Sequence, residues 1–97
     1  MTRDEFVFTI GFQGDAAIVD SRALKRHRKL STMELAREGL FRAAFCSATY
    51  SGSSEELDEF VTFFGEETGM ADLTVERLQR LFGVYTVPDQ VKRIVTV

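Results

Sequence analysis

The chain has 97 residues, of which 44% are apolar and 28% are charged, and its formal net charge is -3. This length fits a single compact domain over residues 1–97, and the composition excludes an intrinsically disordered chain. One cysteine excludes an internal disulfide, and no run of residues approaches the ~18 apolar positions of a membrane-spanning helix. No signal-peptide pattern is present, so we expect a cytoplasmic protein without a membrane partner.

The first predicted element is a strand over residues 5–13, because large apolar side chains recur there at every second position. Gly14 and Asp15 form a typical turn pair, and residues 16–19 return as the second strand of an antiparallel hairpin. We expect helices to cover the apolar face of the first strand. The side chains of that face are Phe6, Phe8, Ile10 and Phe12.

Residues 21–30 hold a run of basic residues without an acid, and the meaning of the run depends on the backbone conformation. In a strand the positive charges would fall on both faces, whereas in a helix they gather on one side. The other side of that helix would carry Ala23, Leu24, His27 and Leu30. The sequence therefore favours a short helix capped by Asp20 or Ser21, with a mobile basic loop as the alternative. We call the basic residues the cationic ridge, and they are Arg22, Lys25, Arg26, Arg28 and Lys29.

A capping-box pattern at Ser31 and Glu34 predicts that a second helix begins there and runs to about residue 49. Its polar arc is narrow, so we expect it to be the central and most buried helix. Gly39 would lie in the middle of this helix, where a glycine costs about 1 kcal/mol relative to alanine. Close packing against a neighbouring element would offset that cost.

Ser53 and Glu56 repeat the capping-box pattern and predict a third helix that runs to about residue 64. Either Gly65 or Gly69 is expected to end it, because glycine readily adopts the left-handed conformation of a helix C-terminus.

Thr74 is expected to cap a fourth helix that ends at Gly83, and the β-branched segment 91–97 predicts a strand that joins the hairpin. The predicted fold is therefore α+β, with an N-terminal antiparallel β-hairpin and a C-terminal strand packed against three to four short helices. The predicted core consists of Phe6, Phe8, Ile10, Phe12, Leu40, Phe41, Ala44, Leu57, Phe60, Phe64, Leu78 and Leu81.

The stretch from Glu55 to Glu67 is acidic and contains no base. Its carboxylates would spread around a helix instead of converging on one loop, and acids near a helix N-terminus are favourable without any ligand. Cys46 and His27 are too few for a zinc site, and Cys46 has the pattern of a core residue. We therefore expect no metal, no cofactor and no catalytic residues.

The cationic ridge is the candidate interaction surface, since a concentrated patch of one sign steers a partner of the other. The separated charges and the unpaired strand edges favour a small non-enzymatic protein that acts through protein–protein contacts, with a homodimer as one form. The alternative is a nucleic-acid-binding regulator that uses the basic face of residues 22–29. No aromatic residue lies within the ridge to stack on a base, which makes nucleic acid the second choice.

Overall fold

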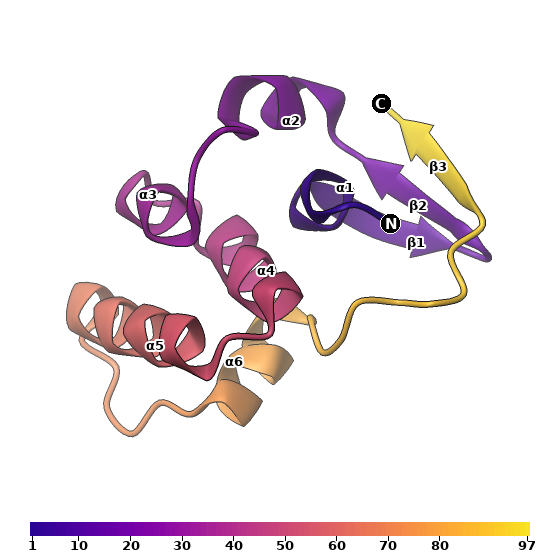
Figure 1. Ribbon diagram of the computed structural model, residues 1–97. Helices are drawn as coiled ribbons and strands as arrows, with labels where there is room; N and C mark the ends of the chain where they lie inside the picture. Colours follow the sequence, from indigo (N-terminus) through magenta and orange to yellow (C-terminus); the bar gives the residue numbers. More distant parts are fainter.

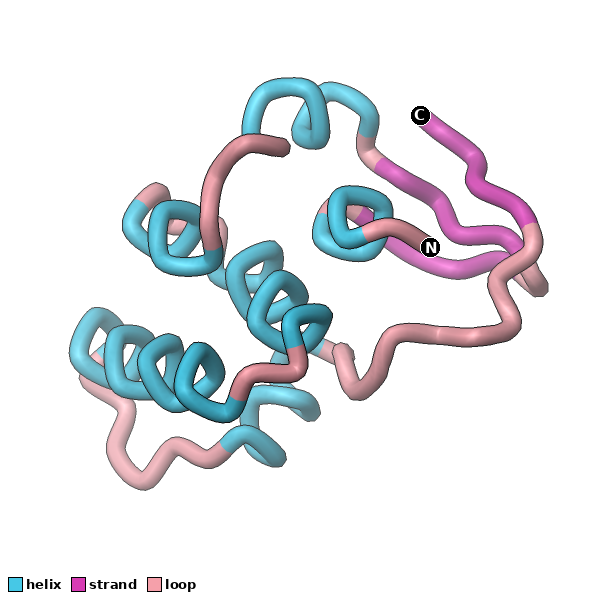
Figure 2. The backbone as a smooth tube through the Cα atoms, in the orientation of Figure 1, coloured by secondary structure: helices cyan, strands magenta, loops and turns pink.

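Helices and one mixed sheet make up the computed structural model, which describes residues 1–97 (Figure 1). The elements in chain order are α1 (Arg3–Val7), β1 (Thr9–Gln13), β2 (Ala16–Val19), α2 (Ser21–His27), α3 (Thr32–Arg37), α4 (Phe41–Ser51), α5 (Ser54–Thr68), α6 (Val75–Phe82) and β3 (Arg93–Thr96). The strands gather on one side of the molecule, away from α3 and α5, with α4 between the two parts (Figure 2). The predicted α+β class, with its hairpin and C-terminal strand, is confirmed, and the helices number six. None of them is long and apolar enough to cross a membrane.

The predicted strand over residues 5–13 is wrong at its beginning, where the chain forms α1 instead. The Thr2 hydroxyl accepts a hydrogen bond from the Glu5 N–H at 3.2 Å, and the Glu5 carboxylate accepts one from the Thr2 N–H at 2.7 Å. This reciprocal capping box stabilises a helical turn that the alternation of phenylalanines does not reveal. Phe6 and Phe8 are buried as expected, but they reach the core from α1 and its C-terminal cap.

A β-bulge in β1 overturns the predicted burial of two further residues. The pairing register with β2 shifts between Thr9 and Gly11, so Ile10 is the extra residue and is 62% exposed. Phe12, beyond the bulge, is 49% exposed. The predicted single face of four apolar side chains therefore does not form.

The sheet has the strand order β1-β2-β3, with β2 in the middle. β1 and β2 form the predicted antiparallel hairpin, and β3 runs parallel to β2. Val19 of β2 belongs to the core, so the residues on its face of the sheet point toward the helices. Ile18 of β2 and Val95 of β3 lie side by side on the opposite face, where Ile18 is partly buried and Val95 is 39% exposed.

The predicted continuous helix over 31–49 is wrong, because the chain forms two helices, α3 and α4, that meet at Gly39. Gly39 has φ = +81°, a conformation that glycine adopts without steric cost. The Leu40 N–H donates to the Leu35 carbonyl at 3.0 Å, and the Gly39 N–H donates to the Ala36 carbonyl at 3.0 Å. These two bonds form a Schellman motif, which ends α3.

The two remaining helices begin at the predicted caps, since Ser53 accepts from the Glu56 N–H and Thr74 accepts from the Arg77 N–H. Of the two predicted stops for α5, Gly69 is correct, and the helix is longer than expected. Gly83 ends α6 as predicted, with φ = +69°.

The centre of the core is a cluster of phenylalanine rings between α4, α5 and α6. The Phe45 ring is fully buried, with its centroid 5.9 Å from that of Phe60 and 5.4 Å from that of Phe82. Phe64 stacks on Phe60 at 5.7 Å and meets Phe41 edge-on at 5.0 Å. Such ring pairs add attraction beyond the burial of apolar area. Leu81, which we predicted in this core, is instead 54% exposed on the outer side of α6.

Replacing Phe45 by alanine should lower the free energy of unfolding by about 3–5 kcal/mol, because a cavity forms where the ring is fully enclosed. The matched control is Leu81→Ala, which removes an exposed side chain and should change stability by less than about 1 kcal/mol. Urea denaturation followed by circular dichroism measures both values. Equal losses for the two variants would contradict the described packing.

Candidate functional site

The predicted helix is confirmed over Ser21–His27, and the cationic ridge runs along α2 into the turn that follows it, which carries Arg28 and Lys29. The Asp20 carboxylate caps α2, accepting from the N–H groups of Arg22 and Ala23, each at 3.1 Å. The apolar side of α2 packs against the core, and the His27 ring stacks on Phe8 with centroids 6.5 Å apart. All of the ridge residues are exposed, and these are Arg22, Lys25, Arg26, Arg28 and Lys29.

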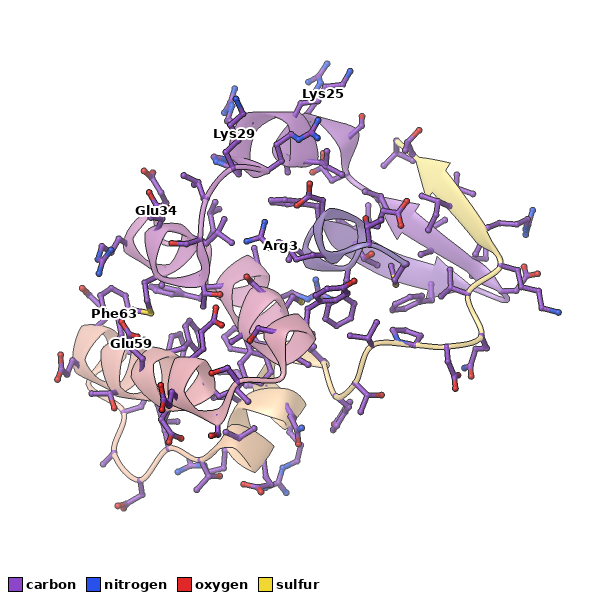
Figure 3. The ribbon with its side chains drawn as sticks, in the orientation of Figure 1. Arg3, Lys25, Lys29, Glu34, Glu59 and Phe63 are labelled. Carbon is purple, nitrogen blue, oxygen red and sulfur yellow. The ribbon has the colours of Figure 1, made fainter.

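Most of the ridge charge has no acidic partner within the molecule. Arg28 pairs with Asp4 at 3.8 Å, and the other four ridge residues form no ion pair. Lys25 of α2 and Lys29 of the turn after it project away from the body of the protein (Figure 3). The cationic ridge is therefore accessible to an anion or to an acidic surface of another molecule.

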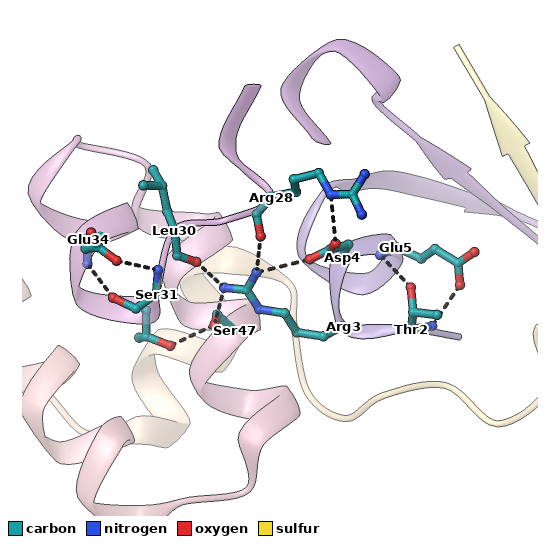
Figure 4. Close-up of polar contacts among 10 residues, drawn as sticks. Thr2, Arg3, Asp4, Glu5, Arg28, Leu30, Ser31, Glu34 and Ser47 are labelled. Atoms are coloured by element: carbon teal, nitrogen blue, oxygen red, sulfur yellow. Dashed lines mark hydrogen bonds and ion pairs between the residues drawn. The ribbon is translucent and has the colours of Figure 1, made fainter. Parts of the chain in front are cut away.

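Arg3 fixes the C-terminal end of the ridge in place. Its guanidinium group donates to the carbonyl of Arg28 at 3.2 Å and to that of Leu30 at 2.6 Å, and it pairs with Asp4 at 3.1 Å (Figure 4). These carbonyls belong to the turn between α2 and α3. Carbonyls that follow the end of a helix have no N–H partner in that helix, so they need another donor. One arginine from α1 thus holds the turn that carries Arg28 and Lys29.

A chain of buried hydroxyls continues this contact into the helical part of the molecule. Arg3 also donates to the Ser47 hydroxyl at 3.0 Å, Ser47 lies 2.7 Å from the Thr32 hydroxyl, and Thr32 contacts the Glu56 carboxylate. Each hydroxyl can donate once, so the chain is satisfied if it runs from Arg3 through Ser47 and Thr32 to Glu56. It joins α1, α4, α3 and α5.

The acidic residues of α5 do not neutralise the ridge. Glu59 of α5 lines a pocket together with Met33 and Arg37 of α3, and Lys25 lies beyond α3, on α2 (Figure 3). No ion pair joins α5 to α2, and no group of three or more potential metal-ligating side chains comes together. Glu56 of α5 lines one pocket together with Arg28 and Lys29, so the acidic helix approaches the end of the ridge there without forming an ion pair with it.

Cys46 and His27, the single thiol and the single imidazole, belong to different helices. Burial raises the pKa of the Cys46 thiol to about 11, and the charge of Arg42 only partly offsets this. The thiol is therefore protonated at neutral pH, whereas a cysteine nucleophile needs the thiolate. Cys46 acts as a small core residue, as its pattern predicted.

The outer edge of β3 is a second candidate surface. Val97 donates its N–H to Val19 at 3.0 Å, and Arg93 donates its N–H to Asp15 at 3.2 Å, so these alternate residues bond toward β2. The N–H and C=O groups of Ile94 and Thr96 point the other way, and no strand pairs with them there. All four residues of β3 are exposed.

A pocket of about 350 Å³ lies between β1 and the segment over residues 83–90. Its walls include the rings of Phe6, Phe12 and Tyr85, and Arg42 of α4 also lines it. Sequence reasoning missed this pocket, because it depends on the path of an irregular segment past β1. Tyr85 lies outside any periodic segment, and the alternation that includes Phe12 predicts a buried side chain and not a pocket wall.

No protein-family model matches the chain, and neither the curated proteins nor the solved structures contain a significant match to it.

Replacing Arg3 by methionine should destabilise the protein by about 1–3 kcal/mol, because the Ser47 hydroxyl and the carbonyls of the α2–α3 turn lose their donor. The matched control is Arg77→Met, which removes an arginine that also donates to two carbonyls, but in an exposed setting. We expect faster amide hydrogen exchange at residues 28–31 in the Arg3 variant only. Unchanged exchange in this turn would contradict the role given to Arg3.

Proposed function

We propose that the protein acts without catalysing a reaction, through contacts with other protein chains, and that its first partner is a second copy of itself. The observation that carries the proposal is the open edge of β3. Unpaired N–H and C=O groups along a strand edge are a template for another strand. Closed symmetric dimers are the commonest soluble oligomers, so a self-complementary edge favours this partner.

Along β3 the backbone N–H and C=O groups point alternately toward β2 and away from it. The outward groups allow one symmetric arrangement of two copies with four backbone hydrogen bonds. If two β3 strands pair antiparallel about a two-fold axis at Val95, Ile94 of one copy faces Thr96 of the other, and the reverse. Each of these two pairs exchanges both of its N–H···O bonds, which uses the groups that point away from β2. The product is one continuous sheet of six strands, built from the three of each copy.

The side chains are compatible with this register. Val95 would face its own copy in the closely spaced, non-hydrogen-bonded pair, and Arg93 would face Val97, so no like charges oppose each other. Arg93 is already partly neutralised by Asp15 at 3.2 Å. Because the strand is short, the interface is small, and we expect a dissociation constant on the order of 100 µM.

The other edge of the sheet is less suited to pairing. β1 contains the bulge at Ile10, and the Arg42 guanidinium donates to the Thr9 carbonyl at 2.7 Å. Bulges and bound side chains are devices that protect a strand edge. The open edge is therefore the one at β3.

Replacing Thr96 by proline should raise the dimer dissociation constant at least tenfold, since it removes an outward N–H and places a ring at the edge. The bonds between β3 and β2 should survive, because the Thr96 N–H does not take part in them. Sedimentation equilibrium between 10 µM and 1 mM measures the dissociation constant, and circular dichroism checks the fold.

The matched control for this experiment is Ser54→Pro at the first position of α5, where a helix tolerates proline, with Thr62→Ala as a milder surface change. Neither should alter dimer formation. A wild-type protein that stays monomeric at 1 mM would contradict the dimer, and a dimer that persists in the Thr96 variant would contradict the β3 edge as its interface.

A second candidate function is nucleic-acid binding by the cationic ridge, favoured by the four ridge residues that form no ion pair. Exposed lysine and arginine side chains bind phosphates and release counterions, so affinity falls as salt rises. The net charge of -3 and the absence of a stacking residue in the ridge keep this candidate second.

The triple variant Arg22→Gln, Lys25→Gln and Arg26→Gln separates this candidate from the first. If the ridge binds phosphates, the slope of log affinity against log salt should become shallower by about 2–3 for random DNA or RNA, as measured by fluorescence anisotropy. The control is Arg77→Gln with Arg80→Gln on α6, which changes charge elsewhere. An affinity that the ridge variant leaves unchanged would refute nucleic-acid binding by α2.

A further inference from the structure

We propose that the pocket between β1 and residues 83–90 binds a small organic acid, with its carboxylate on Arg42 and its apolar part among aromatic rings. This goes beyond the proposed function, because it concerns a small molecule and a surface that neither β3 nor the ridge contributes to. Three observations support it: an unpaired positive charge, a set of exposed rings, and a cavity of suitable size.

Arg42 is only partly exposed, and no acidic side chain lies within ion-pair distance of it. One N–H group of its guanidinium donates to the Thr9 carbonyl at 2.7 Å, which orients the group without neutralising it. Every buried side-chain nitrogen or oxygen in the protein has a hydrogen-bond partner. Any nitrogen of the Arg42 guanidinium that has no partner is therefore accessible to solvent. Arg42 thus offers a fixed cation with free donors at the wall of a pocket.

The apolar part of the pocket comes from three aromatic residues. Phe6 is buried and forms the floor, whereas Phe12 is 49% exposed and Tyr85 is 54% exposed. Two large rings that remain exposed beside a cavity leave apolar area that a ligand can cover. Val84, which is buried, anchors the start of the segment that closes this side.

The charges favour a carboxylate over a phosphate. Arg42 is the only cationic side chain lining the pocket, and Asp89 on the same lining repels any anion, a doubly charged one more strongly than a singly charged one. One guanidinium matches one carboxylate in a two-bond arrangement, whereas phosphate sites gather several donors or cations. A volume of about 350 Å³ is at the lower end of ligand pockets, which suits an acid with a single ring.

The test uses 3-phenylpropionate, with the neutral 3-phenylpropanol and the cationic 3-phenylpropylamine as matched probes. Titration of the ¹⁵N-labelled protein should shift the amide resonances of Thr9, Phe12 and Tyr85, with a Kd on the order of 1 mM for the acid. The acid should bind about tenfold more tightly than the alcohol, and the amine should bind most weakly. Equal affinities for the three probes, or shifts centred elsewhere, would overturn the proposal.

Arg42→Gln should remove the preference for the acid while the alcohol still binds, so the alcohol reports whether the variant keeps its fold and pocket. Arg80→Gln on α6 is the matched control and should leave the tenfold preference intact. Tyr85→Ala should weaken all three probes, whereas Met70→Ala, which removes an exposed apolar side chain outside this pocket, should not. An acid preference that survives in Arg42→Gln would overturn the assignment of the carboxylate to Arg42.

Discussion

The packing of α4 against its neighbours is the constraint on which the rest of the structure depends. Its residues from Ala44 to Ala48 are all buried, and α1, α3 and α5 all contact it. Small side chains at Ala44 and Ala48 let these elements approach closely, while Phe45 fills the space toward α5 and α6. The same helix carries Ser47 to the polar chain beneath the ridge and Arg42 to the edge of β1. The cationic ridge and the pocket beside β1 are therefore both positioned by α4.

Much of the helical part could be predicted from local chemistry alone. Capping residues mark helix starts because a side-chain oxygen accepts from an N–H that has no partner in the first turn. This pattern predicts the starts of three helices, at Ser31, Ser53 and Thr74. The helical spacing on α2 also placed the ridge correctly on one side. Thr2 and Glu5 show the same capping signal before α1, but the alternating phenylalanines that follow them favoured a strand. The capping signal is the more specific of the two patterns, because it provides partners for two backbone N–H groups at the start of a helix.

The errors that remain concern features that no single local pattern determines. A glycine such as Gly39 fits a helix interior as well as a helix end. The hydrogen bonds that the N–H groups of Gly39 and Leu40 donate show that it is a helix end here. The bulge at Ile10 depends on how β1 fits beside β2, so it cannot be inferred from β1 alone. The pocket depends on where residues 83–90 run after α6. Each is set by tertiary contacts between segments distant in the chain.

The β3 edge and the cationic ridge lie next to each other, and the two proposed interactions should depend on salt in opposite ways. The N–H and hydroxyl of Ser21, the first residue of α2, both donate to the Val97 carbonyl, at 3.1 Å and 2.7 Å, so the ridge begins beside the end of β3. Pairing two β3 strands would therefore bring two ridges toward one sheet, where their positive charges repel each other. Salt screens this repulsion over a Debye length of ~10 Å at 0.1 M, so rising salt should strengthen the dimer. The proposed binding of a polyanion by the ridge would follow the reverse trend, because it would depend on counterion release. A polyanion that spans both ridges would in turn stabilise the dimer, since each binding event lowers the cost of the other.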